Sequence, residues 1–166
     1  MKMTAPPHSA SATWRHLAAA LLTLLALAFG SCAQATGTPA TQEEAVAMVK
    51  KALAYIRKNG KEKAFAEFNQ TQGQFVDREL YIAVLDLNGV MLAHGANSKL
   101  VGKSLLDIKD VQGKAFVREQ VAIARTKGNG WVEFEWINPV SQKMEHRITY
   151  LERQDDYFVL SGVYRK

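Results

Sequence analysis

The sequence predicts a single α+β domain in which helices pack on an antiparallel sheet of five strands. Two tight turns predict the sheet, since Asn88-Gly89 and Asp155-Asp156 each separate a pair of apolar runs. A stretch of apolar residues at 3-4 spacing precedes the first run and predicts a long N-terminal helix. A further helix is expected between the second and third strands. Strands joined by short turns pair antiparallel, which gives the α+β class.

The first helix has a start and a stop in the sequence. Thr41 and Glu44 match a capping box, so we expect the helix to begin there. Apolar residues recur at helical spacing as far as Ile56, and Asn59-Gly60 is a stop signal. A second short helix is expected over residues 61–68.

The Asn88-Gly89 turn predicts the register of the first hairpin, formed by residues 80–87 and 90–93. A two-residue type I′ turn suits Asn-Gly because both positions need a positive φ. The pairs expected from this register are Leu87 with Val90, Leu85 with Leu92 and Ala83 with His94. Tyr81 would then lie diagonally beside His94 on the same face of the sheet.

The rest of the chain alternates loop, helix and strands. Residues 95–114 read as a loop with several glycines, and 114–127 as a helix that ends at Gly128-Asn129-Gly130. A strand over 131–137 would place Val132, Phe134 and Trp136 on one face. The last hairpin is expected to pair residues 144–153 with 157–164.

Composition excludes several classes of protein. Apolar residues make up 48% of the 166, which excludes wholesale disorder. One cysteine cannot form an intramolecular disulfide or a cysteine-based zinc site. The chain has 21 Lys and Arg residues against 16 Asp and Glu, with no block of five or more like charges, so we expect no nucleic-acid partner.

The first 35 residues read as an export signal. Lys2 and Arg15 precede an uncharged apolar run, 17–29, that is shorter than the ~20 residues a membrane span needs. Ala33-Gln34-Ala35 has the form of a cleavage site, so the signal is expected to be cut near Ala35. Cys32 leaves a second interpretation open, in which it becomes the lipidated first residue of a lipoprotein.

The expected organisation is therefore a removed signal over 1–35, a linker over 36–40 and one domain over 41–166. The mature protein would be weakly basic and located in the periplasm or secreted. It would contact a membrane only if lipidated at Cys32.

Several motifs occur in a recognisable order. They are Leu80-Tyr81-Ile82, Asp86-Leu87-Asn88-Gly89, Leu92-Ala93-His94, Leu100-Val101-Gly102-Lys103-Ser104-Leu105, Asp110, Gly113-Lys114, Phe116-Val117, Gly130-Trp131, Trp136, Asn138-Pro139, Arg147, Tyr150 and Gly162-Val163-Tyr164. In this order they resemble the single Cache domain family of extracytoplasmic, PAS-like sensor modules. The resemblance covers roughly residues 41–166 and implies the PAS-like five-stranded plan.

The resemblance also implies a function. Domains of this family usually sit in chemoreceptors and histidine kinases, and several bind small carboxylates such as acetate, propionate, pyruvate or lactate. This chain ends at Lys166, directly after its last predicted strand, so it looks like a stand-alone secreted member. It is expected to act in chemotaxis or signal transduction through a partner, such as a membrane receptor or kinase.

Five residues are candidates for the ligand site. Arg147 offers a guanidinium that can grip a carboxylate with two parallel hydrogen bonds. Tyr81 and His94 can donate hydrogen bonds from their shared face, and Trp136 offers an apolar wall. Tyr150 joins them because the family motif carries it. Residues three apart on a strand face opposite ways, however, so Arg147 and Tyr150 can share a pocket only if a bulge intervenes or if one of them reaches around an edge of the sheet.

Each candidate also has a purely structural interpretation. Arg147 could be an exposed strand residue, His94 a satisfied structural group, and Trp136 and Tyr150 ordinary core.

Two other functions compete with ligand binding. An enzyme needs a nucleophile beside a base, paired catalytic carboxylates or a metal, and no catalytic residue, metal site or cofactor is expected here. An interaction module could instead dock on a receptor or kinase through the Lys-rich first helix. A closed cavity lined by Arg147, Tyr81 and His94 would favour ligand binding, whereas a filled core with an exposed apolar stripe would favour docking.

Overall fold

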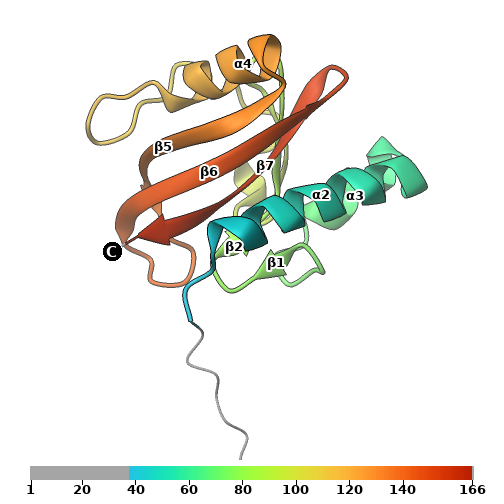
Figure 1. Ribbon diagram of the computed structural model, residues 1–166, viewed down its shortest axis with the longest axis horizontal. Helices are drawn as coiled ribbons and strands as arrows, with labels where there is room; N and C mark the ends of the chain where they lie inside the picture. Colours follow the sequence, from blue (N-terminus) through green and yellow to red (C-terminus); the bar gives the residue numbers. More distant parts are fainter. Residues whose placement is uncertain (1–37, 166) are drawn as a thin grey trace, which may run out of the picture. The chain divides into compact units, whose positions relative to one another are not determined.

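The computed structural model describes residues 38–165, so the predicted signal over 1–35, with Cys32 and Ala35, lies outside the described residues. The elements are α2 Gln42–Asn59, α3 Lys61–Phe68, β1 Val76–Asp77, β2 Leu80–Tyr81, β3 Ala83–Asp86, β4 Met91–His94, the 3-10 turn η2 Ser98–Leu100, α4 Phe116–Thr126, β5 Asn129–Ile137, β6 Met144–Gln154 and β7 Tyr157–Arg165. Five strands form one antiparallel sheet in the order β4-β3-β7-β6-β5, which confirms the predicted fold class (Figure 1).

The first helix begins and ends where the sequence predicts. The amide of Glu44 donates to the Thr41 hydroxyl at 3.3 Å, and the Glu44 carboxylate accepts from the amide of Thr41 at 2.8 Å. At the other end, Gly60 adopts a φ of 84° and its amide donates to the carbonyl of Ile56. A positive φ favours glycine, so Gly60 both ends α2 and precedes α3.

The sheet separates the apolar core into two layers, because side chains alternate between its faces. α2 and α3 cover one face, where Val49, Leu53 and Phe68 pack on the sheet. α4 covers the other face, where Phe116, Val117 and Val121 do the same (Figure 1).

The first hairpin keeps the predicted register at its open end and loses it near the turn. Ala83 pairs with His94 as expected, but Leu85 pairs with Met91 rather than Leu92, and Leu87 does not pair with Val90. The cause is Asp86, whose carboxylate accepts from the amides of Asn88 and Val90 at 2.9 and 2.8 Å. The turn therefore closes as a loop of three residues. A bulge between Val84 and Leu85 then returns the pairing to the predicted register at Val84 and Ala83.

Two smaller features differ from the expected elements. β1 and β2 form a two-stranded ladder across the turn at Arg78, which is too short to leave a periodic signal in the sequence. α4 begins at Phe116 rather than Lys114, because the Asp110 carboxylate accepts from the amides of Gln112 and Lys114 and holds them in a turn.

The last hairpin pairs without a register shift over its whole length. Arg147 pairs with Tyr164, and Thr149 pairs with Gly162. The two backbones approach closely at Gly162, where a Cβ would come 2.6 Å from both the carbonyl oxygen of Ile148 and the hydroxyl of Thr149. The regular pairing places Arg147 on the α4 side of the sheet together with Phe134, its partner on β5.

Candidate functional site

Arg147 is the centre of the site. It lies on β6 with 2% of its surface exposed. It is the largest of the fully buried side chains in residues 38–165. Its Nη1 donates to the hydroxyls of Tyr81 and Tyr164, the latter at 3.1 Å. The guanidinium carbon lies 4.2 Å from the centre of the Tyr81 ring and 5.1 Å from that of Tyr164.

The other two donor atoms of Arg147 are buried without partners. Within the described part of the chain, Nε and Nη2 form no hydrogen bond. Burial lowers the pKa of Arg147, and the Tyr164 hydroxyl opposes this effect. An arginine nevertheless stays protonated at ordinary pH, and a buried charge is costly unless it is paired. The protein therefore holds a positive charge and two free donors inside its core.

Tyr164 is a site residue that the sequence analysis missed. Its hydroxyl accepts from Arg147 and donates to the carbonyl of Ile137 at 3.0 Å. The signal was present, because a two-residue turn at Asp155-Asp156 places Tyr164 opposite Arg147 on the neighbouring strand.

His94 is a fixed hydrogen-bond donor. Its Nδ1 accepts from the amides of Ala96 and Asn97 at 3.2 and 2.9 Å, and burial lowers its pKa to about 4. A neutral imidazole whose Nδ1 accepts must carry its proton on Nε2. Its ring lies 4.8 Å from that of Tyr81, on the shared face that the hairpin register predicts.

A small cavity brings four of the five sequence-predicted residues together. Its volume is about 30 Å³, and Arg147, Tyr81, His94 and Trp136 all line it. The apolar part of the wall is formed by Leu85, Met91, Leu105, Phe116, Phe134 and Leu160. The floor is the sheet and the roof is α4, whose Phe116 stacks on Phe134 with 4.0 Å between ring centres.

A second hollow lies beside the cavity. It measures about 240 Å³ and shares Tyr81, His94 and Trp136 with the cavity. Ile137, at the end of β5, and Gln142, from the segment between β5 and β6, also line it. These shared side chains are therefore the wall between the two spaces.

Gln120 is a second residue that the sequence analysis missed. It lies on α4, is 2% exposed and lines the cavity. It follows Phe116 by four residues, so it falls on the stripe that also carries Val121 and Ala124. A polar residue on an otherwise apolar helix stripe was the available signal.

Tyr150 does not reach the cavity. No bulge interrupts the pairing of β6, so Tyr150 faces the α2 side, opposite to Arg147. Its hydroxyl donates to Glu152 at 3.0 Å, and its ring lies 5.2 Å from that of Trp131. The structure thus separates the two residues as strand alternation requires.

Metal-binding clusters and membrane-spanning helices are both absent from the described residues. No group of three or more His, Cys, Asp or Glu side chains in residues 38–165 could hold a metal ion. No helix in the same range combines the length and the apolar character of a membrane span.

Known proteins share both the sequence pattern and the fold. A family model described as single Cache domain 2 matches residues 12–165. The methyl-accepting chemotaxis protein McpP of Pseudomonas putida is 32% identical over 90 residues, a match that covers 53% of this chain and 16% of that protein. The chain thus spans only a small part of this curated relative.

Solved structures agree on the fold. A methyl-accepting chemotaxis protein from Vibrio parahaemolyticus superimposes with a TM-score of 0.63 at 23% identity, over 74% of this chain and 86% of that one. A periplasmic sensor domain of a chemotaxis protein gives 0.60 at 22% identity, over 93% and 100%. At these identities the likeness shows the fold alone.

One further structure is described as a Cache chemosensory domain that recognises carboxylic acid. It gives a TM-score of 0.60 at 26% identity, over 75% of this chain and 88% of that one. Together with the family match, these findings confirm the PAS-like α+β fold and indicate a sensing module rather than an enzyme. The chain belongs to the single Cache domain 2 family of extracytoplasmic sensor domains.

Proposed function

We propose that this protein senses a short organic carboxylate, which it binds reversibly in the cavity beside Arg147. The observation that carries the proposal is the pair of buried donors without partners, Nε and Nη2 of Arg147. These two nitrogens form one edge of the guanidinium, and their N–H groups are parallel. A carboxylate accepts from such an edge with both oxygens at once, and its charge offsets the buried cation.

The rest of the cavity suits the same ligand. The Nε2–H group of His94 adds a neutral donor, and Trp136 with the apolar wall accommodates a short carbon chain. The volume of about 30 Å³ is far below the ~300–1,000 Å³ of ordinary ligand pockets. It favours the smallest acids, such as acetate, propionate, pyruvate or lactate. The Cache chemosensory domain at 26% identity, which is described as recognising carboxylic acid, supports this class of ligand.

The proposal includes a location and a route for the signal. Export through residues 1–35, with cleavage near Ala35 or lipidation at Cys32, would deliver residues 41–166 as one sensor domain outside the cytoplasm. The domain would then report ligand through a membrane receptor or kinase. The chemotaxis protein McpP, which matches over 90 residues, supports a role in chemotaxis or signal transduction.

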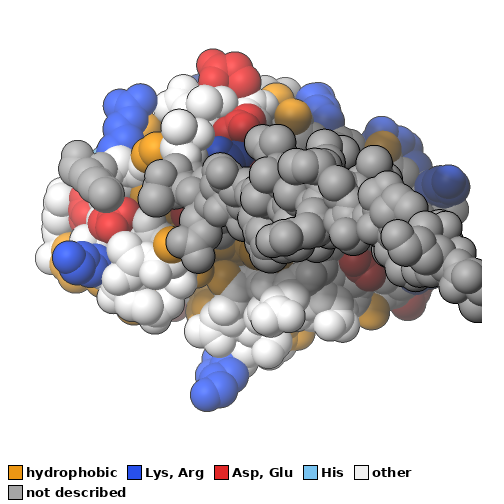
Figure 2. Space-filling model, turned by 90° about the horizontal axis from the view of Figure 1, so that it is seen from below, with side chains coloured by type: hydrophobic (Ala, Val, Ile, Leu, Met, Phe, Trp, Pro, Cys, Tyr) orange, Lys and Arg blue, Asp and Glu red, His pale blue; other side chains and the backbone are white. Residues whose placement is uncertain are grey.

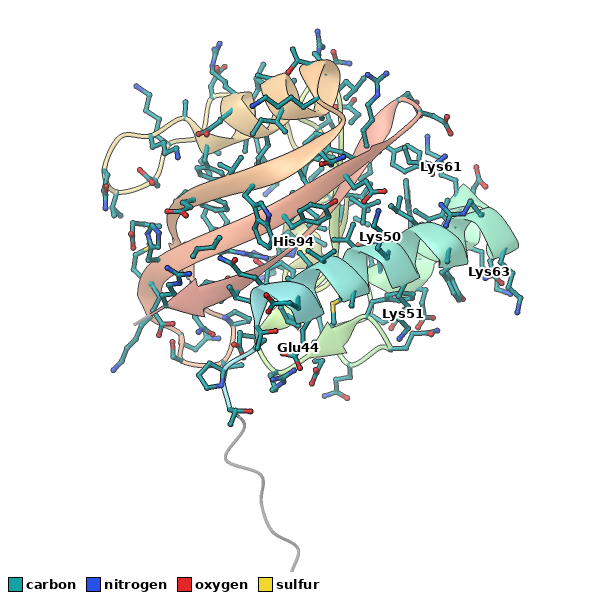
Figure 3. All side chains as sticks on the ribbon, viewed as in Figure 1. Glu44, Lys50, Lys51, Lys61, Lys63 and His94 are labelled. Carbon is teal, nitrogen blue, oxygen red and sulfur yellow. The ribbon has the colours of Figure 1, made fainter. Side chains whose placement is uncertain are left out.

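The structure gives less support to docking through the Lys-rich helices. Figure 3 shows Lys50, Lys51, Lys61 and Lys63 spread along α2 and α3. Lys50 pairs with Glu152 at 2.6 Å, Lys51 donates to the carbonyl of Gln74, and Lys61 lies 3.6 Å from Asp156. On the face shown in Figure 2, the visible Lys and Arg side chains stand as separate groups around the rim. Lys50, Lys51 and Lys61 thus already contact residues of their own chain. This favours a solvated surface over a docking surface.

A thermal-shift screen of the purified protein against short carboxylates, amino acids, amines and purines tests the proposal. Ligand at 100 times its dissociation constant should add about 2.7 kcal/mol to the free energy of unfolding, an easily measured rise in Tm. The shift should appear with short carboxylates and disappear in Arg147→Ala. Arg153→Ala is the matched control, because Arg153 lies on the same strand and is exposed. A shift that survives Arg147→Ala would move the ligand to another site, and no shift with any carboxylate would refute the proposal.

A further inference from the structure

We propose that Gln120 makes the cavity selective for carboxylates that carry a second oxygen, a hydroxyl or oxo group, over unsubstituted acids of the same length. This inference rests on the proposed function, because it concerns the same cavity. It assigns to α4 a role in choosing the ligand, in addition to its role in packing.

The first observation is that the Gln120 amide lies at the cavity wall in the core and has no hydrogen-bond partner among the described residues. Gln120 is 2% exposed, and its side-chain amide forms no hydrogen bond with another residue in the described part of the chain. An amide in the core without a partner destabilises the protein, so this position favours a group that can form hydrogen bonds with it. Its neighbours Phe116, Val117 and Val121 are apolar and cannot do so.

The second observation is where the amide lies. Gln120 lines the cavity from the α4 roof, whereas Arg147 lines it from the sheet. A ligand whose carboxylate binds Arg147 therefore extends its other end away from the sheet, toward the helix. In a cavity of about 30 Å³, that other end is only one or two carbon atoms from the carboxylate.

The chemistry of the amide then defines the second group of the ligand. A glutamine amide offers both N–H donors and a carbonyl acceptor. It can donate to an oxo group, or accept from a hydroxyl group and donate to it. A methyl group at the same place would leave the amide unpaired, and sites built to bond an oxygen discriminate against analogues that lack it.

The test compares three acids with the same number of carbon atoms by isothermal titration calorimetry of the full chain. Lactate carries a hydroxyl group, pyruvate an oxo group and propionate neither. We expect lactate or pyruvate to bind wild type about fivefold more tightly than propionate, the worth of one neutral hydrogen bond. In Gln120→Met, which keeps a side chain of similar length without the amide, the affinities should become equal.

Gln112→Met is the matched control. Gln112 is exposed, bonds Glu135 and does not line the cavity, so this variant should keep the wild-type preference. Propionate binding by Gln120→Met serves as its folding control, with Gln120→Leu as a second variant if the first does not fold.

The outcomes separate the two proposals. Equal affinity of wild type for the three acids, or an unchanged preference in the Gln120 variants, overturns the role of Gln120 and leaves carboxylate binding intact. Failure of wild type to bind any of the three acids overturns the proposed function itself.

Discussion

At the scale of single residues, the proposal implies that Arg147 lowers the stability of the fold and is kept for ligand binding. Its guanidinium is fully buried, and of its three nitrogens only Nη1 has partners among residues 38–165. Buried charges of this kind often destabilise a protein relative to an apolar side chain of similar size. Under the proposed function, the cost of burying this charge is offset only when a ligand is bound.

Arg147→Met tests this implication. Without ligand, the variant should unfold at the same urea concentration as wild type or a higher one, with a gain of about 1 kcal/mol, because the desolvated charge is gone. Binding of short carboxylates should be lost. Arg153→Met, on the exposed part of β6, should change neither property. A loss of more than about 2 kcal/mol in Arg147→Met would show that Arg147 is mainly a structural residue.

His94 makes stability depend on pH on the acid side. Burial lowers its pKa from 6.5 to about 4, so the unfolded chain takes up this proton more readily than the folded protein. Stability from this group is complete above pH 6.5, falls as the pH drops toward 4 and is constant below that. The loss amounts to roughly 3 kcal/mol.

Urea unfolding between pH 4 and 7 measures this effect. His94→Gln should flatten the fall in the free energy of unfolding between pH 6.5 and 4, relative to wild type. His146→Gln is the control, because hydrogen bonds to Glu135 and Glu133 raise the pKa of His146. Its stabilising effect is complete below pH 6.5 and is lost only as the pH rises above that value. Identical acid slopes in wild type and His94→Gln would contradict the assignment.

At the scale of elements, the β6–β7 pair positions the site. Tyr164 on β7 lies opposite Arg147 on β6, and the next pair on the same face is Thr149 with Gly162. The hydroxyl of Thr149 is buried and has no hydrogen bond within the described residues. Gly162 thus leaves space for a close backbone approach one pair away from Arg147.

Gly162→Ala should disturb both stability and binding. The added Cβ would meet the carbonyl of Ile148 and the hydroxyl of Thr149 at 2.6 Å, so β6 and β7 must separate locally. We expect a loss of about 1–3 kcal/mol in chemical denaturation and weaker carboxylate binding, because Arg147 moves with β6. Ser161→Ala, the neighbouring substitution on the same strand, should cost less than this. Gly162→Ala with wild-type stability would contradict the close packing of the two strands.

Elements that are determined by residues close together in the sequence were predicted best. The capping box of α2 and the turn of the last hairpin involve residues close in sequence, and both predictions are confirmed. The bulge in the first hairpin was missed because the Asp86 side chain competes with the backbone for the turn. A turn motif read from Asn-Gly alone does not include that competition.

At the scale of the whole molecule, the site depends on contacts that span the chain. Tyr81, Gln120 and Arg147 come from β2, α4 and β6. β2 leads directly into β3, and the sheet order places β3 and β6 on either side of β7. The alternation of side chains along a strand predicted that Arg147 and Tyr150 face opposite sides of the sheet. It did not predict which side α4 would cover. That choice depends on packing between distant segments, so the sequence signals at Gln120 and Tyr164 could be assigned to the site only from the three-dimensional structure.

The two faces of the sheet should respond differently to ligand. In hydrogen exchange at short labelling times, saturating carboxylate should slow the amides of α4 and β6 that open locally. The amides of α2 and α3 should change less, because those helices pack on the opposite face. Arg147→Met with the same carboxylate is the control. Equal protection of α2 and α4 would show that binding stabilises the domain only as a whole.

The unbroken alternation along β6 also limits how this protein can change over evolutionary time. Arg147 and Thr149 face α4, whereas Ile148 and Tyr150 face α2. Deleting one residue from β6 would exchange these two sets, moving the charge of Arg147 into the apolar layer under α2 and an apolar side chain into the cavity. New ligand preferences can therefore arise through substitutions at positions such as Gln120, while the length of β6 has to stay constant.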